Sequence, residues 1–515
     1  MTLFRKWLIY FLMNRFPGFL LLLASLSFCN LHLNNTGDPF TFTNLFTKYL
    51  LEAKPQCEAR EWEFNHLESR AGGKPFLYTV ENASGEVYTI FQTYDTFENR
   101  LNEVSGTNAL NVMLIKFNAS GKILWSRSLG IADDGFNHLK LTDNGVIATA
   151  NVLSSVGTPI HAYSGISNTN IAVFSVASNG DVIWNTYIND EGVNNFKTAA
   201  LETRSNGEIL VLGYTSAASK PKGFGEDRFP SRAANTDLIL VNLSPSGKGN
   251  WFLSVGNSTQ TTEGMSLKKI DDDNILILGK SKAALDPAFF SSPIFPYTGA
   301  SVNFQYVILH YNVNTRNLKH TFIGTDSNII NVVPPSIQYD HSKNLIYLGL
   351  ALAGSIGGEI RGPSASNDPL LVQLDSNLNR KWISYFGTTD LDLFPGNIDI
   401  YPNGSVYTSV SYGSMNPNLG NQYPGSFSHD GILEYNSEGQ IVRYVLIPTY
   451  DLRYVYPLQT IHSCDGGYLL SSISFDISIA ANPTNPAATK IKKIKNTDFP
   501  RPRPYLFPTG GTIFR

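Results

Sequence analysis

The sequence predicts an all-β protein, a seven-bladed β-propeller with four-stranded antiparallel blades, the last blade being closed by an N-terminal strand. Two series of hairpin signals alternate along the chain with a period of roughly 60 to 70 residues. Two hairpins per period supply the four strands of a blade, which distinguishes a propeller from a solenoid. We label the four strands of a blade a to d, from the axis outward.

The a–b hairpins are recognised by their tight turns. Asn-Gly and Asp-Gly pairs accept positive φ at both central positions, as a two-residue hairpin requires. An apolar run follows each turn and reads as strand b. The series comprises Ser84-Gly85, Asn144-Gly145, Asn206-Gly207, Asp273-Asn274, Lys343-Asn344, Asn403-Gly404 and Asp465-Gly466.

The c–d hairpins combine an apolar strand, a turn with Gly or Asn, and a second strand with an aromatic residue. The first of them has an apolar strand at 111–117, a turn at 118–121 and Trp125. Because a tryptophan recurs at a similar offset, we interpret these residues as structural contacts between neighbouring blades. The set is Trp125, Trp184, Trp251 and Trp382.

The last blade lacks an obvious outer strand, because seven a–b hairpins precede only six clear c–d hairpins. Residues 489–494 can serve as its strand c, with lysines on an exposed face. Residues 59–64 alternate polar and aromatic side chains, as the other d strands do. We therefore predict that this N-terminal strand completes the last blade and removes its open edge.

The first residues predict export. Residues 1–28 read as a signal peptide, because positive charge precedes an apolar run at 19–26 that is too short to span a membrane. Translation could begin at Met1 or at Met13. Residues 29–56 are expected to be a tether with a short helix, residues 57–496 the propeller, and residues 497–515 a Pro-rich tail.

Two further predictions concern the three cysteines. Leu26 to Cys29 resembles a bacterial lipobox, although Phe28 replaces the usual small residue before the cysteine. The resemblance implies acylation of Cys29 and a stable membrane anchor; an ordinary signal peptide is the alternative. Cys57 and Cys464 could form a disulfide in an oxidising compartment or remain two separate thiols.

The repeated units at residues 59 to 495 resemble the bacterial SBBP-type β-propeller repeat of spirochaetal lipoproteins. The matching features are the Asn-Gly and Asp-Gly turns, the Asp or Asn that opens strand c, and the Gly–Trp–Gly spacing around strand d. The resemblance implies the architecture and a location in the cell envelope, with the outer membrane favoured and its leaflet left open. It does not identify a ligand.

Long b–c connections are predicted to gather on one face, where binding surfaces are commonly built. They are rich in aromatic residues, which could anchor a protein or glycan ligand. The alternative is that these side chains fasten the loops to the propeller. The candidates are Phe224, Phe229, Phe289, Phe290, Phe295, Tyr297, Tyr412, Tyr423 and Phe427.

Acidic residues recur in the d–a connections, near the expected axis. A ring of carboxylates could bind Ca²⁺, which takes roughly 6–8 oxygen ligands. The alternative is that each carboxylate accepts hydrogen bonds within its own turn, and no other cofactor is expected. The residues are Asp134, Asp190, Asp326, Asp390 and Asp451.

Composition and motifs favour a binding protein. A formal net charge of −3 and the lack of a long basic face argue against a nucleic-acid partner. No nucleophile elbow, phosphate loop or metal-spaced His/Cys set is recognised. We expect a monomeric interaction scaffold of the envelope that reaches the membrane only through its lipid. The alternatives are a propeller hydrolase or lyase with axial carboxylates, and a structural or assembly module.

Overall fold

The computed structural model divides into residues 1–56 and 57–515. It describes residues 61–67, 77–103, 109–133, 135–164, 169–190, 195–216, 220–230, 236–257, 259–299, 303–325, 329, 335–360, 362–363, 368–386, 393–400, 405–412, 429–447, 453–463, 468–476 and 488–494. All of them lie in the second unit, so the predicted signal peptide, tether, Pro-rich tail, Cys29, Cys57 and Cys464 fall outside the described residues.

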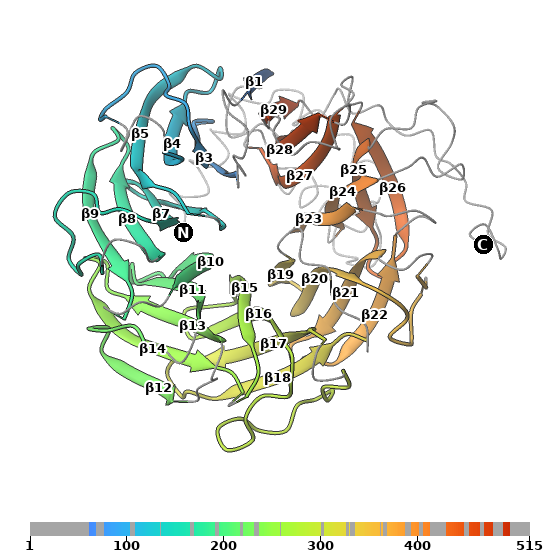
Figure 1. Ribbon diagram of the computed structural model, residues 1–515. Helices are drawn as coiled ribbons and strands as arrows, with labels where there is room; N and C mark the ends of the chain where they lie inside the picture. The colour runs from blue at the N-terminus through green and yellow to red at the C-terminus, as the bar shows by residue number, and fades with distance from the viewer. Residues whose placement is uncertain are drawn as a thin grey trace, which may run out of the picture. The chain divides into compact units, whose positions relative to one another are not determined.

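The described residues form strands and no helix, and the strands make seven sheets in chain order (Figure 1). None of these segments is therefore an apolar helix of membrane-spanning length. The first sheet contains β2 (Tyr78–Glu81), β3 (Val87–Thr93), β4 (Asn111–Phe117) and β5 (Ile123–Ile131). The second contains β6 (His138–Thr142), β7 (Gly145–Val152), β8 (Asn170–Ala177) and β9 (Val182–Ile188). The third contains β10 (Phe196–Thr203), β11 (Ile209–Ser216), β12 (Glu226–Pro230), β13 (Thr236–Leu243) and β14 (Gly249–Val255).

The other four sheets repeat the same antiparallel order. They contain β15 (Thr262–Lys269), β16 (Asn274–Ser281), β17 (Gln305–Asn312) and β18 (Leu318–Ile323); β19 (Ser336–Asp340), β20 (Leu345–Leu352), β21 (Asp368–Asp375) and β22 (Arg380–Tyr385); β23 (Leu393–Ile400), β24 (Val406–Tyr412), β25 (His429–Tyr435) and β26 (Ile441–Ile447); and β27 (Arg453–His462), β28 (Tyr468–Asp476), β29 (Ala488–Ile494) and β1 (Trp62–Leu67).

Burial of both faces determines how the sheets pack. Every residue of β3, β4 and β7 is buried, so these strands need a neighbouring layer on each side. The first strand of each sheet contacts the first strand of the next, and β27 contacts β2, which closes the cycle. The prediction of an all-β protein is confirmed, and repeated four-stranded antiparallel sheets that contact in a cycle are consistent with a β-propeller-like fold.

The N-terminal strand lies in the last sheet, at the place that the sequence analysis expects. β1 pairs with β29 in antiparallel register, with Phe64 opposite Ile491. The rings of Trp62 and Phe64 lie 5.6 Å and 5.0 Å from that of Phe117 in the first sheet. These residues belong to one apolar cluster that joins the first and last sheets.

Polar contacts join the same two sheets on the inner side of this cluster. Lys493 Nζ lies 2.6 Å from Glu81 Oε1, and the two side chains are 0% and 2% exposed. Ser471 Oγ lies 2.9 Å from Thr79 Oγ1. The pairing of distant chain ends is thus stabilised by both apolar burial and a buried ion pair.

Tryptophan–glycine contacts join neighbouring sheets on the outer side. Trp125 Nε1 donates to the carbonyl of Ser178 at 3.0 Å, and a Cβ on Gly180 would lie 3.0 Å from the Trp125 ring. Gly180 has φ +91°, so its turn also requires the conformation that glycine adopts readily. Equivalent contacts pair Trp184 with Gly247, Trp382 with Gly439 and Trp62 with Gly121.

At two junctions between sheets the tryptophan–glycine contact is absent, and other residues fill its place. Leu378, with φ +67° and no exposed surface, occupies the turn position that glycine holds elsewhere. The preceding sheet has Lys319 and His320 rather than a tryptophan at the matching part of β18, which leaves room for the leucine. At the other junction the ring of Trp251 is covered by Arg228, whose guanidinium carbon lies 4.1 Å from the ring centroid.

The long b–c connections differ from the expectation of a free binding face. Described parts of them run along the outermost strands: Ile160 N donates to Asn185 O at 2.9 Å, and Ile360 N to Ile383 O at 2.8 Å. In the third sheet the connection forms β12, which pairs in parallel with β14 as a fifth strand. The connections therefore cover strand edges that would otherwise be open, a role that their polar, aromatic composition did not reveal.

The buried ion pair at the junction of the first and last sheets gives a direct test of closure. Lys493→Met leaves the Glu81 carboxylate buried without this ion pair, and should lower the free energy of unfolding by about 3–5 kcal/mol. Lys492→Met is the control, because Lys492 is 43% exposed and lies 3.8 Å from Glu63; it should change stability by less than about 1 kcal/mol. Equal losses in urea denaturation would contradict the assignment.

Candidate functional site: the central pocket

A cavity of about 190 Å³ lies between the first strands of six sheets, and we call it the central pocket. Five of its lining residues carry the argument below: Tyr78 of β2, His138 and Lys140 of β6, Glu202 of β10, and Lys268 of β15. The remaining lining residues are Leu77, Phe136, Asn137, Ala200, Leu201, Met265, Ser266, Leu267, Pro335, Ser336, Ile337, Gln338 and Asn397.

Strand periodicity explains why polar side chains meet in the pocket. His138 and Lys140 are two residues apart on β6, and Ser266 and Lys268 are two apart on β15, so each pair shares one face of its strand. The intervening Leu139 and Leu267 are buried. First strands therefore combine an apolar face, which packs within the sheets, with a polar face toward the centre.

Lys140 and Glu202 neutralise each other across neighbouring sheets. Lys140 Nζ lies 2.7 Å from Glu202 Oε2, and the glutamate side chain is 7% exposed. A carboxylate this deeply buried requires a partner, because desolvation of an isolated charge is costly. The pair links β6 to β10 and leaves little free charge at this point of the wall.

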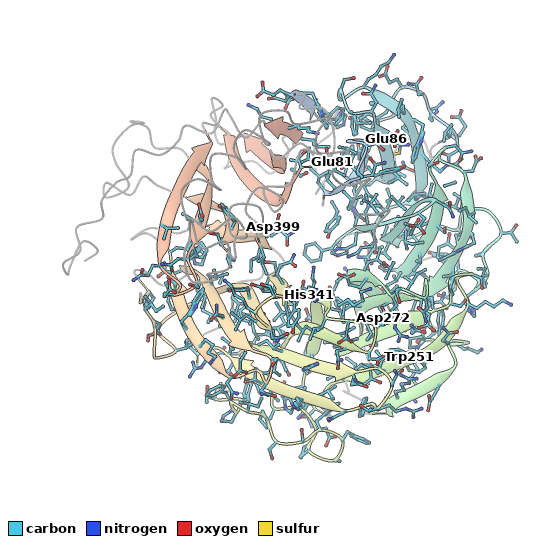
Figure 2. The ribbon with its side chains drawn as sticks, turned by 180° about the vertical axis from the view of Figure 1, so that it is seen from behind. Glu81, Glu86, Trp251, Asp272, His341 and Asp399 are labelled. Atoms are coloured by element: carbon cyan, nitrogen blue, oxygen red, sulfur yellow. The ribbon has the colours of Figure 1, made fainter. Side chains whose placement is uncertain are left out.

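Lys268 stands in a different electrostatic environment. Across the described ranges it makes no hydrogen bond and no ion pair within 4 Å. Burial lowers the pKa of Lys268; Glu202 and Asp399 act to raise it, and Lys140 and Lys269 to lower it further. Figure 2 labels Asp399, which lies on β23 at the inner side of its sheet. The neighbouring Lys269 contacts Asp272 instead, at 3.3 Å.

Tyr78 and His138 form an adjacent pair of neutral groups, with ring centroids 5.1 Å apart. Burial, and then the charge of Glu202, raises the pKa of Tyr78 to about 12. Burial lowers the pKa of His138 to about 4, against a hydrogen bond with the backbone of Ala199. His138 Nε2 is buried and has no hydrogen-bond partner in the described part of the chain.

The pocket thus offers one uncompensated ammonium group, one internal ion pair, a neutral imidazole, a neutral phenol and several amide and hydroxyl groups. This set can bind a small polar molecule. The volume is below the ~300–1,000 Å³ of pockets that hold drug-sized ligands, so the bound unit must be small.

The aromatic candidates on the b–c connections pack mainly against the scaffold. Phe224 and Phe290 are 1% and 5% exposed, which does not suit ligand anchors. Phe290 lies 5.6 Å from Phe229, Phe295 lies 4.5 Å from the Arg380 guanidinium, and Tyr297 contacts Phe322 edge-on. Phe289, by contrast, is 41% exposed. Tyr423, Phe427 and the side chain of Tyr412 lie outside the described residues.

One of the acidic residues predicted near the axis lies within the described part of the chain. Asp190 is described and is not among the lining residues. Asp134, Asp326, Asp390 and Asp451 lie outside the description. Within the described ranges, no group of three His, Cys, Asp or Glu side chains is arranged to bind a metal ion; the Ca²⁺ hypothesis remains a prediction for the residues beyond them.

The residues of the central pocket were missed from sequence because no motif links them. They come from six different sheets and share no common spacing. Lys140, Glu202 and Lys268 are not distinguished by charge alone, because β10 and β15 also contain Lys197, Glu263 and Lys269.

Comparisons with known proteins give limited information. No family model matches the chain, and no curated protein matches it. Among solved structures, the polysaccharide lyase Uly1 aligns over 81% of this chain and 89% of its own, with 9% identity and a TM-score of 0.45. A DUF4221 family member from Bacteroides vulgatus atcc 8482 aligns over 85% and 97%, with 10% identity and a TM-score of 0.34. Neither likeness is strong enough to assign an activity.

Burial of His138 predicts a measurable pH dependence. Because its pKa is about 4 when folded and about 6.5 when unfolded, protonation favours the unfolded chain. Its contribution is therefore present above pH ~6.5 and is lost as the pH falls towards 4, by up to roughly 3 kcal/mol. His138→Gln should flatten the fall in unfolding free energy over that range, whereas the exposed His341→Gln should not; identical slopes would refute the assignment.

Proposed function

We propose that this chain is a seven-bladed β-propeller, exported and held in the cell envelope by a lipid on Cys29, that binds a small polar ligand in its central pocket. The observation that carries the binding proposal is the convergence of polar side chains from the a strands around one cavity, where Lys268 has no direct ion-pair partner among the described residues. A rigid closed cycle of sheets would hold such groups in place before the ligand arrives.

The pocket is a better candidate than the long b–c connections that first suggested a binding face. The described parts of those connections are hydrogen-bonded to the outermost strands, and two of their aromatic residues, Phe224 and Phe290, are buried. A pocket of this volume would accept the end unit of a glycan or a free small molecule rather than a protein surface. We therefore keep the prediction of a glycan ligand and place its binding site in the central pocket instead of on the b–c connections.

Filling the central pocket should abolish binding without disturbing the fold. Ser266→Phe places an aromatic ring among the lining residues, and we expect at least a tenfold loss of affinity for any ligand found by screening monosaccharides and small organic acids. Ser84→Phe is the control, because Ser84 is exposed in an a–b turn. Titration calorimetry measures both; unchanged affinity in Ser266→Phe would eliminate this site.

A propeller enzyme, hydrolase or lyase, is the second candidate, and the neutral imidazole of His138 beside the Tyr78 phenol favours it. At neutral pH the imidazole is unprotonated and the phenol is protonated, which are the forms that a base and an acid require, and their pKa values of about 4 and about 12 make them a weak base and a weak acid. If the pair acts in this way, polysaccharide incubated with the protein should yield new reducing ends, and His138→Gln should lower that rate by at least 100-fold. Release at the same rate by both proteins would exclude this role.

The lipid anchor makes an independent prediction. In a bacterial host supplied with labelled palmitate, the full chain should incorporate label and partition into detergent, and Cys29→Ser should do neither. Cys57→Ser should retain both properties, because that cysteine lies beyond the predicted signal. Equal labelling of the wild type and Cys29→Ser would disprove acylation at this residue.

A further inference from the structure

The charges that line the central pocket do not balance. Lys140 and Glu202 form an ion pair at 2.7 Å, which leaves Lys268 as the third charged lining residue and the second cation. Asp399 is near enough to influence Lys268, but it is not a lining residue and makes an interaction of its own. The wall therefore carries one surplus positive charge.

A comparison with the adjacent lysine shows that this surplus is local. Lys269 follows Lys268 on β15, so its side chain leaves the opposite face of the strand. Its ammonium lies 3.3 Å from Asp272 in the next turn. One lysine of the pair thus has a carboxylate partner, whereas the other faces the cavity with no ion-pair partner among the described residues.

An ammonium group that is partly removed from water and lacks a partner is energetically unfavourable. A ligand that brings one negative charge into contact with it recovers a charge-assisted hydrogen bond. A dianion would place its second charge against Glu202, whose own partner is already Lys140. The charge pattern consequently favours a monoanion over both a neutral molecule and a phosphate.

We infer that the central pocket recognises a monocarboxylate of about one sugar ring in size, such as a hexuronate, through an ion pair between its carboxylate and Lys268. This inference rests on the proposed binding function and specifies its ligand class. Ser266, Gln338 and Asn397, which also line the pocket, supply hydroxyl and amide groups that can bind ring hydroxyls.

The test compares four probes by titration calorimetry with the full chain: D-glucuronate, D-galacturonate, D-glucose and inorganic phosphate. At least one uronate should bind tenfold or more tightly than glucose and phosphate, since tenfold corresponds to about 1.4 kcal/mol. Lys268→Met should reduce uronate affinity to that of glucose, and Lys268→Arg should retain a preference for the acid. Lys269→Met is the matched control and should bind as the wild type does.

The outcomes separate the two levels of the proposal. Glucose binding as well as uronate, or undiminished uronate binding by Lys268→Met, would overturn the charge inference while leaving a central binding site intact. Tighter binding of phosphate would overturn the assignment to a monocarboxylate. Failure of every probe to bind the wild type would overturn the ligand class, and the pocket-filling variant would then decide the binding function with other ligands. The comparison of probes on the wild type does not depend on the folding of any variant.

Discussion

Contact between the first strands of neighbouring sheets is the constraint on which the rest of the structure depends. Strands such as β3 and β7 are buried along their whole length, so no sheet can exist without a neighbour on each side. A cycle of sheets meets this requirement only if its last member reaches its first, which β27 and β2 do. The same contact brings polar faces of the first strands together and creates the central pocket.

At the outer contacts between sheets, the packed volume is maintained although the residues that fill it differ from junction to junction. A tryptophan covers a glycine at several junctions, and a Cβ on that glycine would collide with the ring. Where the tryptophan is absent, Leu378 fills the space from the other side; where Trp251 meets no such glycine, Arg228 covers its ring. Close packing requires that each lost volume be filled by a neighbouring side chain, from the opposite sheet for Leu378 and from the same sheet for Arg228.

Much of the architecture could be predicted from local signals. Asn-Gly and Asp-Gly turns mark the a–b hairpins because their backbone conformation is demanding, and the alternation at 59–64 marked β1 because an edge strand keeps one polar face. The central pocket could not be predicted in this way. Lys140, Glu202 and Lys268 lie about one repeat apart in the sequence, and only the packing of first strands places them around one cavity. The course of the b–c connections was also hidden, because edge covering is achieved by backbone hydrogen bonds with little sequence preference.

Hydrogen exchange in the full chain tests the claim that closure by β1 supports the cycle of sheets. Trp62→Ala with Phe64→Ala removes the rings that contact Phe117 across the junction. The account predicts faster amide exchange in β29 and also in β2 to β5, with β15 to β18 nearly unchanged. Faster exchange confined to β1 and β29 would show that β1 merely covers an edge, and would contradict the central claim.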